Sequence, residues 1–185
     1  MMKAYESDRL ILKTLDKTYA SLVVDYYLRN KDFLKEWISL RDESFYTIDS
    51  QEKHLEEDLM NATNKSSLRL WVFDKNNTDR IIGTIAFNHI LWGSSLSCQI
   101  GYRLDKDEIN KGYITEAARR GIEVMFNDYK LHRVEANIMP RNEPSLKVAK
   151  KLGFIDEGVR HKYLKINGKW QDHIHMALIN DKLEG

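Results

Sequence analysis

Cysteine is almost absent from this sequence, and so are long apolar runs and a charge excess of either sign. The single cysteine, Cys98, excludes a disulfide within the chain and fits a reducing compartment. The longest apolar stretches are far shorter than a membrane span, and the segment from Met1 to Asp8 has no apolar signal core. Lys and Arg total 29 against 28 for Asp and Glu, so no global field draws the chain to nucleic acid or membranes. We therefore expect a cytoplasmic protein that binds neither.

Internal repeats, low-complexity tracts and long linkers are also missing. Neither G-x-x-x-x-G-K-[ST] nor G-x-G-x-x-G occurs, which disfavours a nucleotide-hydrolysing loop and a dinucleotide fold. The composition is that of an ordinary globular protein, with 185 residues, 42% of them apolar, four Trp and nine Tyr. This is enough for one sizeable core, and we expect a single domain over residues 1–185.

The most informative segment is Lys111 to Ala117, which reads KGYITEA. An alternating strand pattern over 96–104 precedes it, and an amphipathic helix pattern follows, with Ala117 and Gly121 small enough for close packing on a sheet. A glycine at a helix N-terminus brings free backbone N–H groups and the positive end of the helix dipole together. The segment predicts a site for a phosphorylated cofactor, although a loop glycine before a helix also occurs without any ligand.

A second strand-then-helix unit follows along the chain. Residues 133–138 alternate in polarity, and a helix is predicted over about 143–152, with Asn142 as N-cap, Pro144 in the first turn and Gly153 as the left-handed stop. Two such units in succession predict neighbouring parallel strands. Their C-terminal ends should open onto a shared crevice, which is the usual ligand position in such sheets.

The remaining patterns predict an α/β domain with a mixed sheet of about seven strands. Strands are expected over 9–15, 68–73, 79–90, 96–104, 133–138, 154–166 and 169–179. Further helices are expected over 18–29, around 33–38, and over 50–62 with Leu55, Leu59 and Met60 on the buried side. Asn167-Gly168 is the strongest turn signal present and predicts a closing hairpin.

Several short motifs together resemble the signature of GCN5-related N-acetyltransferases (GNAT), and more closely that of the RimJ/RimL-like ribosomal-protein N-terminal acetyltransferases. The general motifs are Ile100-Gly101-Tyr102, Lys111 to Ala117, His132 to Ala136, Asn142 to Ser145, and Lys151 to Phe154. Those of the branch are Arg9 to Leu12, the Trp37 region, Gly83 to His89, and Asn167 to His173. The likeness spans nearly the whole chain and is specific as a set. It implies one acetyltransferase domain with a mixed, largely antiparallel seven-stranded sheet, splayed parallel central strands and flanking helices.

The resemblance implies acetyl-CoA as co-substrate. Its pyrophosphate would lie on the loop Ile109, Asn110, Lys111, Gly112, Tyr113, Ile114 and Thr115. Its pantetheine arm would pair like an added strand with Ile100, Gly101 and Tyr102, with Asn137 nearby. Asn142 would hold the amide region of the cofactor, and Ser145 would lie near its sulfur. Of the family's loop pattern only Gly112 is present, so binding would depend on backbone N–H groups, with Lys111 adding a charge.

Acetyl transfer to an amine needs a neutral amine, a donor for the developing oxyanion and a proton for the departing thiolate. We expect the donor to be a strand N–H within 99–101 and the proton to come from Ser145, with Asn142 assisting and His89 relaying a proton through water. A Ser145 bonded only to backbone is the alternative. Gln99 stands where relatives often carry a glutamate, and an amide cannot act as the base. This favours an N-terminal α-amine, with a reference pKa of about 7.7–8.0, over a lysine at about 10.4.

Other titratable residues have simpler interpretations. Glu116 lies in a helix's first turn, where an acid usually stabilises the helix dipole. His173 and His175 share one face of the final strand and most simply border the core. No third ligand is positioned beside them by spacing, so we expect no metal.

The family pattern places Trp37, Trp92 and Tyr163 around the acceptor cleft, where aromatics would grip a peptide N-terminus. Packing in the core or in a dimer is the alternative for the tryptophans. Relatives form dimers or higher assemblies, so a homo-oligomer is compatible with the resemblance.

Three functions remain open. The preferred one is acetyl-CoA-dependent acetylation of a protein's N-terminal α-amine. The second is the same chemistry on a small amine such as a polyamine or an aminoglycoside, which needs an acidic pocket that residues 51–58 would supply if they fold over the cleft. The third is a binding module that retains acyl-CoA without turnover.

Overall fold

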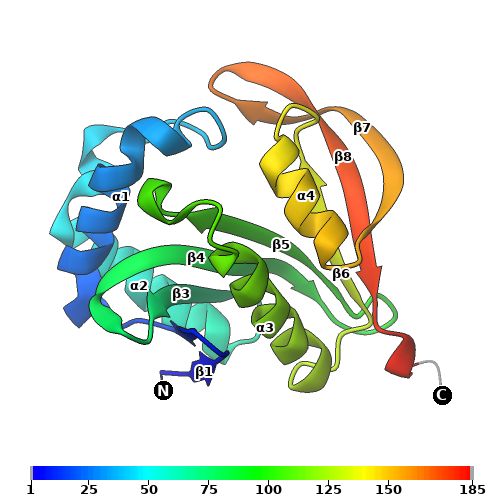
Figure 1. Cartoon of the computed structure of the whole chain (residues 1–185), viewed down its shortest axis with the longest axis horizontal. Coiled ribbons are helices and arrows are strands. Elements are labelled where there is room, and N and C mark those ends of the chain that lie inside the picture. Colours follow the sequence, from blue (N-terminus) through cyan, green and yellow to red (C-terminus); the bar gives the residue numbers. More distant parts are fainter. Residues whose placement is uncertain (1, 184–185) are drawn as a thin grey trace.

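An eight-stranded mixed sheet forms the centre of the computed structural model, which describes residues 2–183 (Figure 1). The strand order is β1-β2-β3-β4-β5-β6-β8-β7, and β5 and β6 are the parallel pair among antiparallel neighbours. The strands are β1 Ala4–Glu6, β2 Leu10–Lys13, β3 Leu68–Asp74, β4 Asn77–Leu91, β5 Ser97–Leu104, β6 Arg133–Ile138, β7 Ile155–Ile166 and β8 Lys169–Ile179.

The sheet has one strand more than the sequence predicts. All seven expected strands form, and the additional one is β1, which pairs with β2 at the edge of the sheet with Tyr5 opposite Leu12. A strand of three residues is too short to show an alternation of period two. Only its pairing with β2 reveals it.

Helices cover both faces of the sheet. Within residues 2–183 the α-helices are α1 Ala20–Leu34, α2 Ile48–Thr63, α3 Tyr113–Asn127 and α4 Glu143–Lys151. Helices α1 and α2 pack on one face around Tyr26, Tyr27 and Trp71, and α3 and α4 pack on the other. None of the helices in the described part of the chain has the length and apolar character that crossing a membrane requires.

Two details of the helix prediction are wrong. The helix expected around 33–38 is not separate, because Phe33 and Leu34 end α1, whose buried stripe continues through Asn30 to Leu34. Met60 was expected on the buried side of α2 but is 58% exposed, since the helix buries Leu55 and Ala62 instead.

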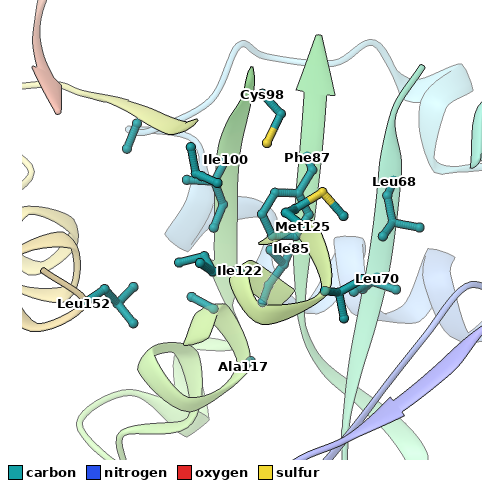
Figure 2. Close-up of a cluster of buried hydrophobic side chains, with 14 of the residues drawn as sticks. Leu68, Leu70, Ile85, Phe87, Cys98, Ile100, Ala117, Ile122, Met125 and Leu152 are labelled. Carbon is teal, nitrogen blue, oxygen red and sulfur yellow. The ribbon is translucent and has the colours of Figure 1, made fainter. Parts of the chain in front are cut away.

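Helix α3 lies close against the sheet, as its small residues predict (Figure 2). Ala117 is fully buried, and a Cβ added at Gly121 would stand 2.9 Å from the ring of Phe87. Cys98 is buried in the same cluster, where burial raises the pKa of its thiol to about 12. This packing sets the position of the α3 N-terminus above the sheet.

The parallel strands β5 and β6 diverge along their length. They pair only where Ser97 to Gln99 lies beside Arg133 to Glu135. Beyond that point β5 continues to pair with β4, and β6 continues to pair with β8. Within residues 2–183, the edges of 100–102 and 136–138 that face each other therefore have no strand partner, and the sheet is open between them.

Candidate active site

A groove of about 960 Å³ occupies the opening between β5 and β6. One wall comes from α3 and α4 and includes Thr115 and Ser145. The opposite side comes from α1 and from the other face of the sheet, and includes Leu34 and Ala86. Because its lining comes from both layers, the groove connects the two faces of the sheet.

The structure brings most of the residues predicted for the site to this groove. Those that line it are Trp37, Ile100, Gly101, Tyr102, Ile109, Asn110, Lys111, Gly112, Ile114, Thr115, Asn137, Asn142 and Ser145. The remaining four are not part of the lining as the structure describes it: Tyr113, His89, Trp92 and Tyr163.

The loop before α3 places Gly112 at the helix N-cap with φ +80°, a left-handed conformation that glycine adopts without strain. The Arg9 guanidinium supports this loop, because its Nη1 donates to the Lys111 carbonyl oxygen at 3.0 Å. It also stacks on the Tyr113 ring, 4.5 Å from the centroid. The Tyr113 hydroxyl donates to Asp74 at 3.0 Å, so this side chain braces the loop from outside the groove.

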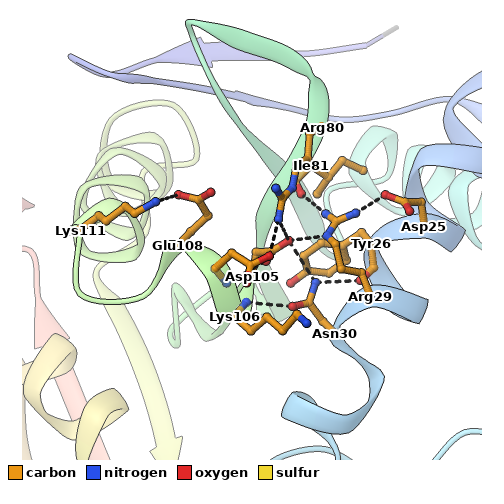
Figure 3. A network of polar contacts seen from close by, with 11 residues as sticks. Asp25, Tyr26, Arg29, Asn30, Arg80, Ile81, Asp105, Lys106, Glu108 and Lys111 are labelled. Carbon is orange, nitrogen blue, oxygen red and sulfur yellow. Dashed lines mark hydrogen bonds and ion pairs between the residues drawn. The ribbon is translucent and has the colours of Figure 1, made fainter.

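Lys111 and Glu116, the charged residues of this segment, both have partners. The Lys111 ammonium pairs with Glu108 at 2.8 Å (Figure 3), which raises the pKa of Lys111 and offsets part of its charge. Glu116 accepts hydrogen bonds from the Ser7 hydroxyl at 2.8 Å and from Arg9 Nε at 2.7 Å. Burial raises the pKa of Glu116, but these bonds and one from the Arg9 backbone outweigh it, and the pKa lies below its usual value. Glu116 therefore holds the N-terminal segment to α3.

A buried carboxylate fixes the start of the same loop (Figure 3). Asp105, which follows β5, is 0% exposed and accepts from Arg29 Nε at 2.7 Å and from Arg80 Nη2 at 3.1 Å. Its second oxygen accepts from the backbone N–H of Asp107 at 3.0 Å. Asn30 of α1 joins the network by accepting from the Lys106 N–H at 2.9 Å. The loop is thus tied to α1 and β4 before it reaches Gly112.

The start of α4 presents a hydroxyl to the groove. Asn142 is the N-cap that the sequence predicts, and its Oδ1 accepts from the Ser145 N–H at 3.2 Å. The Tyr102 hydroxyl donates to the Ser145 carbonyl oxygen at 2.9 Å, and burial raises the pKa of this tyrosine. The Ser145 hydroxyl has no hydrogen bond to any residue within 2–183. It is therefore available to a bound molecule.

The structure places His173 in the groove and His89 outside it. A register shift between Asn88 and Leu91 interrupts β4, and His89 has φ +51° there and is exposed to solvent. His173 on β8 is buried, and its Nδ1 lies 3.1 Å from the Gln171 carbonyl oxygen. Since a carbonyl oxygen only accepts, Nδ1 carries the proton and Nε2 has a free lone pair. Burial lowers the pKa of His173, so the ring is neutral at pH 7.

The predicted aromatic residues separate into different environments. Trp37 lines the groove, and Arg141 stacks on its ring at 5.3 Å. Trp92 instead stacks on Tyr129 and donates from Nε1 to the Lys65 carbonyl oxygen at 3.2 Å. Tyr163 packs edge-on against His173 at 5.9 Å, behind the lining.

Asn137 lines the groove and contacts a buried histidine of β8. Its Oδ1 lies 2.9 Å from Nδ1 of His175, which belongs to a polar cluster with Arg160. Burial lowers the pKa of His175. Within residues 2–183, no three His, Cys, Asp or Glu side chains are grouped to hold a metal ion.

Comparison with known proteins agrees with this geometry. The model of the acetyltransferase (GNAT) domain family matches residues 9–155. The chain belongs to the GNAT acetyltransferase family. It is accordingly an N-acetyltransferase, and acetyl-CoA is the acetyl donor that this family uses.

Several relatives of this GNAT protein match it along almost its full length. The probable N-acetyltransferase YjcK of Bacillus subtilis is 35% identical over 92% of this chain and 94% of its own. The [ribosomal protein uS5]-alanine N-acetyltransferase of Escherichia coli is 34% identical over 93% of this chain and 88% of its own. The crystal structure of the ribosomal-protein-S5-alanine acetyltransferase from Vibrio fischeri superposes with a TM-score of 0.91 at 33% identity, covering 97% of each chain. This GNAT domain is therefore similar to the RimJ/RimL-like branch of the family.

Proposed function

We propose that this protein transfers the acetyl group of acetyl-CoA to the N-terminal α-amine of a protein. The observation that carries the proposal is the groove between the diverging ends of β5 and β6. The lining of this groove includes a left-handed glycine at a helix N-terminus and the hydroxyl of Ser145, which has no hydrogen bond to residues 2–183. When bound, acetyl-CoA would supply the reactive thioester.

The residues of the groove fit such a ligand. The backbone N–H groups that follow Gly112 at the start of α3 suit the pyrophosphate. The unpaired edges at 100–102 and 136–138 offer backbone donors and acceptors to the amides of the pantetheine arm. Asn142 keeps its side-chain N–H₂ available, because its Oδ1 is the group used in the helix cap.

Two side chains are suited to move protons. Ser145 would protonate the departing sulfur, with its backbone held in place by the Tyr102 hydroxyl at 2.9 Å. His173 would accept the proton of the amine at Nε2, which is unprotonated because Nδ1 donates to Gln171. His173 would thus take the place of the glutamate that relatives often carry at the position of Gln99. An α-amine with a pKa of about 7.7–8.0 needs only a weak base.

An N-terminal α-amine is favoured over a polyamine or aminoglycoside as acceptor. The similar proteins of Escherichia coli and Vibrio fischeri are named for acetylating an alanine of a ribosomal protein. Residues 51–58, which would have to supply an acidic pocket for a cationic substrate, lie in α2 with Asp58 paired to Arg69 at 2.8 Å. This pair offsets the charge of Asp58, and Glu57, which lines a pocket beside the groove, is 63% exposed, where solvent screens its charge.

The test is thiol release from acetyl-CoA with a panel of N-terminal peptides and polyamines, for the parent and for Ser145→Ala. We expect the variant to lose about 100-fold in kcat, because general acid catalysis typically contributes that much, while calorimetry shows unchanged CoA affinity. Ser94→Ala, an exposed serine outside the groove, is the matched control.

Each other outcome has a definite meaning. Absence of a calorimetric signal with CoA would refute the proposed function. CoA binding without thiol release for any acceptor would indicate the non-catalytic acyl-CoA-binding module. Equal turnover in the parent and Ser145→Ala would remove Ser145 from the mechanism.

A further inference from the structure

A smaller pocket of about 220 Å³ adjoins the groove on the side of α1 and α2. The two cavities share four residues, Leu34, Ile38, Arg69 and Arg103. A molecule whose amine lies in the groove can therefore extend into this pocket without leaving the protein surface. We call it the side pocket.

The sheet places two arginines at the junction of the cavities. Arg103 of β5 lies opposite Thr84 of β4, and Gly101 lies opposite Ala86, which in turn faces Arg69 of β3. Residues opposite each other, or two apart on one strand, point to the same face of a sheet. Arg69, Gly101 and Arg103 therefore share the face covered by α1 and α2, and Arg103 stands next to the strand segment where the pantetheine arm would lie.

The carboxylates of the side pocket do not pair with Arg103. Asp58 accepts from Arg69 at 2.8 Å, and both side chains are 25% exposed. Glu57 stands at the rim, 63% exposed, with His54 at 3.5 Å. Neither carboxylate approaches Arg103.

The other cations of the lining are also accounted for. Lys31 is paired with Glu43 at 2.6 Å and Lys35 with Asp32 at 3.2 Å, both on the outer surface. Arg41 is exposed and stacks on the Phe45 ring at 5.1 Å.

Arg103 differs from all of these. It is partly buried, and it has neither a hydrogen bond nor an ion pair with any residue from 2 to 183. Removing a charge from water without a partner is costly, so a counter-ion at this position is favoured. A guanidinium matches a carboxylate in a planar, bidentate arrangement that a lysine cannot make.

We propose that Arg103 binds a carboxylate of the amine acceptor, so that the enzyme selects acceptors with a negative charge close to the reactive amine. The inference rests on the proposed acetyl transfer to an α-amine and specifies the chemistry of the acceptor. In a peptide the carboxylate belongs to an Asp or Glu that follows the N-terminal residue. In a free amino acid it is the α-carboxylate, and both sources present the same chemistry to Arg103.

The experiment measures kcat/KM for matched acceptors that differ only in charge. One pair is a peptide beginning Ala-Glu and the same peptide beginning Ala-Gln; the other pair is alanine and alaninamide, with kcat/KM expressed per neutral amine because the carboxylate also raises the pKa of the amine beside it. The parent should prefer the charged member of at least one pair by about tenfold or more, as expected for a charge-assisted hydrogen bond. The pair that shows the preference identifies the source of the carboxylate.

Variants at position 103 assign the preference to this residue. In Arg103→Gln the charged-to-neutral ratio should fall to about one, and Arg103→Lys should retain part of it because the charge remains without the bidentate fork. Arg119→Gln removes an exposed arginine of α3 outside both cavities and should keep the parent ratio. Thermal denaturation of each variant checks that it is folded. If Arg103→Gln does not fold, the charged-to-neutral ratio of Arg103→Lys is compared with that of the parent instead.

The proposal is overturned if the parent shows no charge preference in either pair, or if Arg103→Gln keeps the parent ratio. Turnover of neutral peptides without any preference would refute the role of Arg103 and leave the proposed function intact. If no acceptor is turned over, the affinities of the same Ala-Glu and Ala-Gln peptides for the CoA-saturated protein are compared by calorimetric titration. Equal affinities there would refute the role of Arg103 independently of catalysis.

Discussion

His173 shows how one hydrogen bond and the burial of a ring decide what a residue can do. Its Nδ1 is held by the Gln171 carbonyl oxygen, which leaves Nε2 as the acceptor, and burial keeps the ring neutral. The sequence led instead to His89, which follows a strand motif typical of the family. His89 is turned to solvent where the β4–β5 pairing shifts register, and no local pattern signals that shift.

The first prediction concerns the pH dependence of the reaction. Burial disfavours the charged imidazole, so the pKa of His173 lies below its usual value of about 6.5 and the base form dominates at pH 7. Because the acceptor amine must be neutral, we expect kcat/KM of the parent to fall already as the pH drops below about 8, and to fall more steeply below about 6.5 as His173 is protonated. His173→Gln should lower the rate and remove the second, lower inflection. His89→Gln is the comparison. If it lost the inflection while His173→Gln kept it, the proton would pass through His89.

Ser145 and Arg103 also differ in how far the sequence alone could identify them. The family resemblance pointed to Ser145, and the structure shows that its hydroxyl is free of intramolecular bonds within the described residues. Arg103 carries no motif. What distinguishes Arg103 is that it has no partner among residues 2–183. The sequence could not show this, because the partners of a residue in a sheet come from distant parts of the chain.

At the level of elements, Asp105 connects the end of β5 to α1, to β4 and to the loop before α3. Burial raises the pKa of Asp105, but hydrogen bonds from the Asp107 backbone and from Arg29, Asn30 and Arg80 outweigh this effect and hold the pKa below its usual value. The folded state therefore binds this proton less readily than the unfolded chain does. The stabilisation is complete above about pH 4 and is lost as the pH falls further.

The second prediction follows from this network. Asp105→Asn leaves Arg29 and Arg80 without their shared counter-charge, and we expect the free energy of unfolding to fall by about 3 kcal/mol in chemical denaturation. The acid-dependent part of the stability curve should flatten, and CoA affinity should weaken because the loop loses its anchor. Asp107→Asn, at a carboxylate that is 56% exposed and pairs with the same Arg80, should cost less than about 1 kcal/mol. Equal losses in the two variants would contradict the anchoring role.

Across the whole molecule, the C-terminal hairpin is joined to the segment that follows α1, next to the groove (Figure 1). Asn167, in the turn between β7 and β8, accepts from the Leu40 N–H at 2.8 Å and donates to the Lys35 carbonyl oxygen at 2.7 Å. Trp37, between these two contacts, lines the groove. The turn therefore holds this wall of the groove in place.

The third prediction tests this connection. Asn167→Gly keeps the left-handed turn, where Asn167 has φ +49°, but deletes both side-chain hydrogen bonds. We expect faster amide hydrogen exchange over residues 36–41 and a KM for the acceptor several-fold higher, with little change in CoA affinity. Asn167→Asp retains the oxygen that accepts from Leu40, so its exchange rate and KM should lie between those of the parent and those of Asn167→Gly. Unchanged exchange over 36–41 in Asn167→Gly would show that the segment is held by other contacts, such as Arg141 to the Glu36 carbonyl oxygen.

The sequence by itself determined the features that depend on neighbours a few residues away. These include the bounds of β6, the Asn142 cap of α4, the Asn167-Gly168 turn and the glycine at the start of α3. Periodicity and capping are local properties, because the hydrogen bonds and the buried face of an element repeat every two to four residues.

Only the tertiary structure decided where the pairing of β5 and β6 stops, and hence where the groove lies. It also decided that β1 adds an edge strand, that His173 rather than His89 lines the groove, and that Arg103 stands without a counter-charge among residues 2–183. These features are set by contacts between segments far apart in the chain. No local pattern encodes which distant backbone or carboxylate will be near, and the chemistry of the site depends on those contacts.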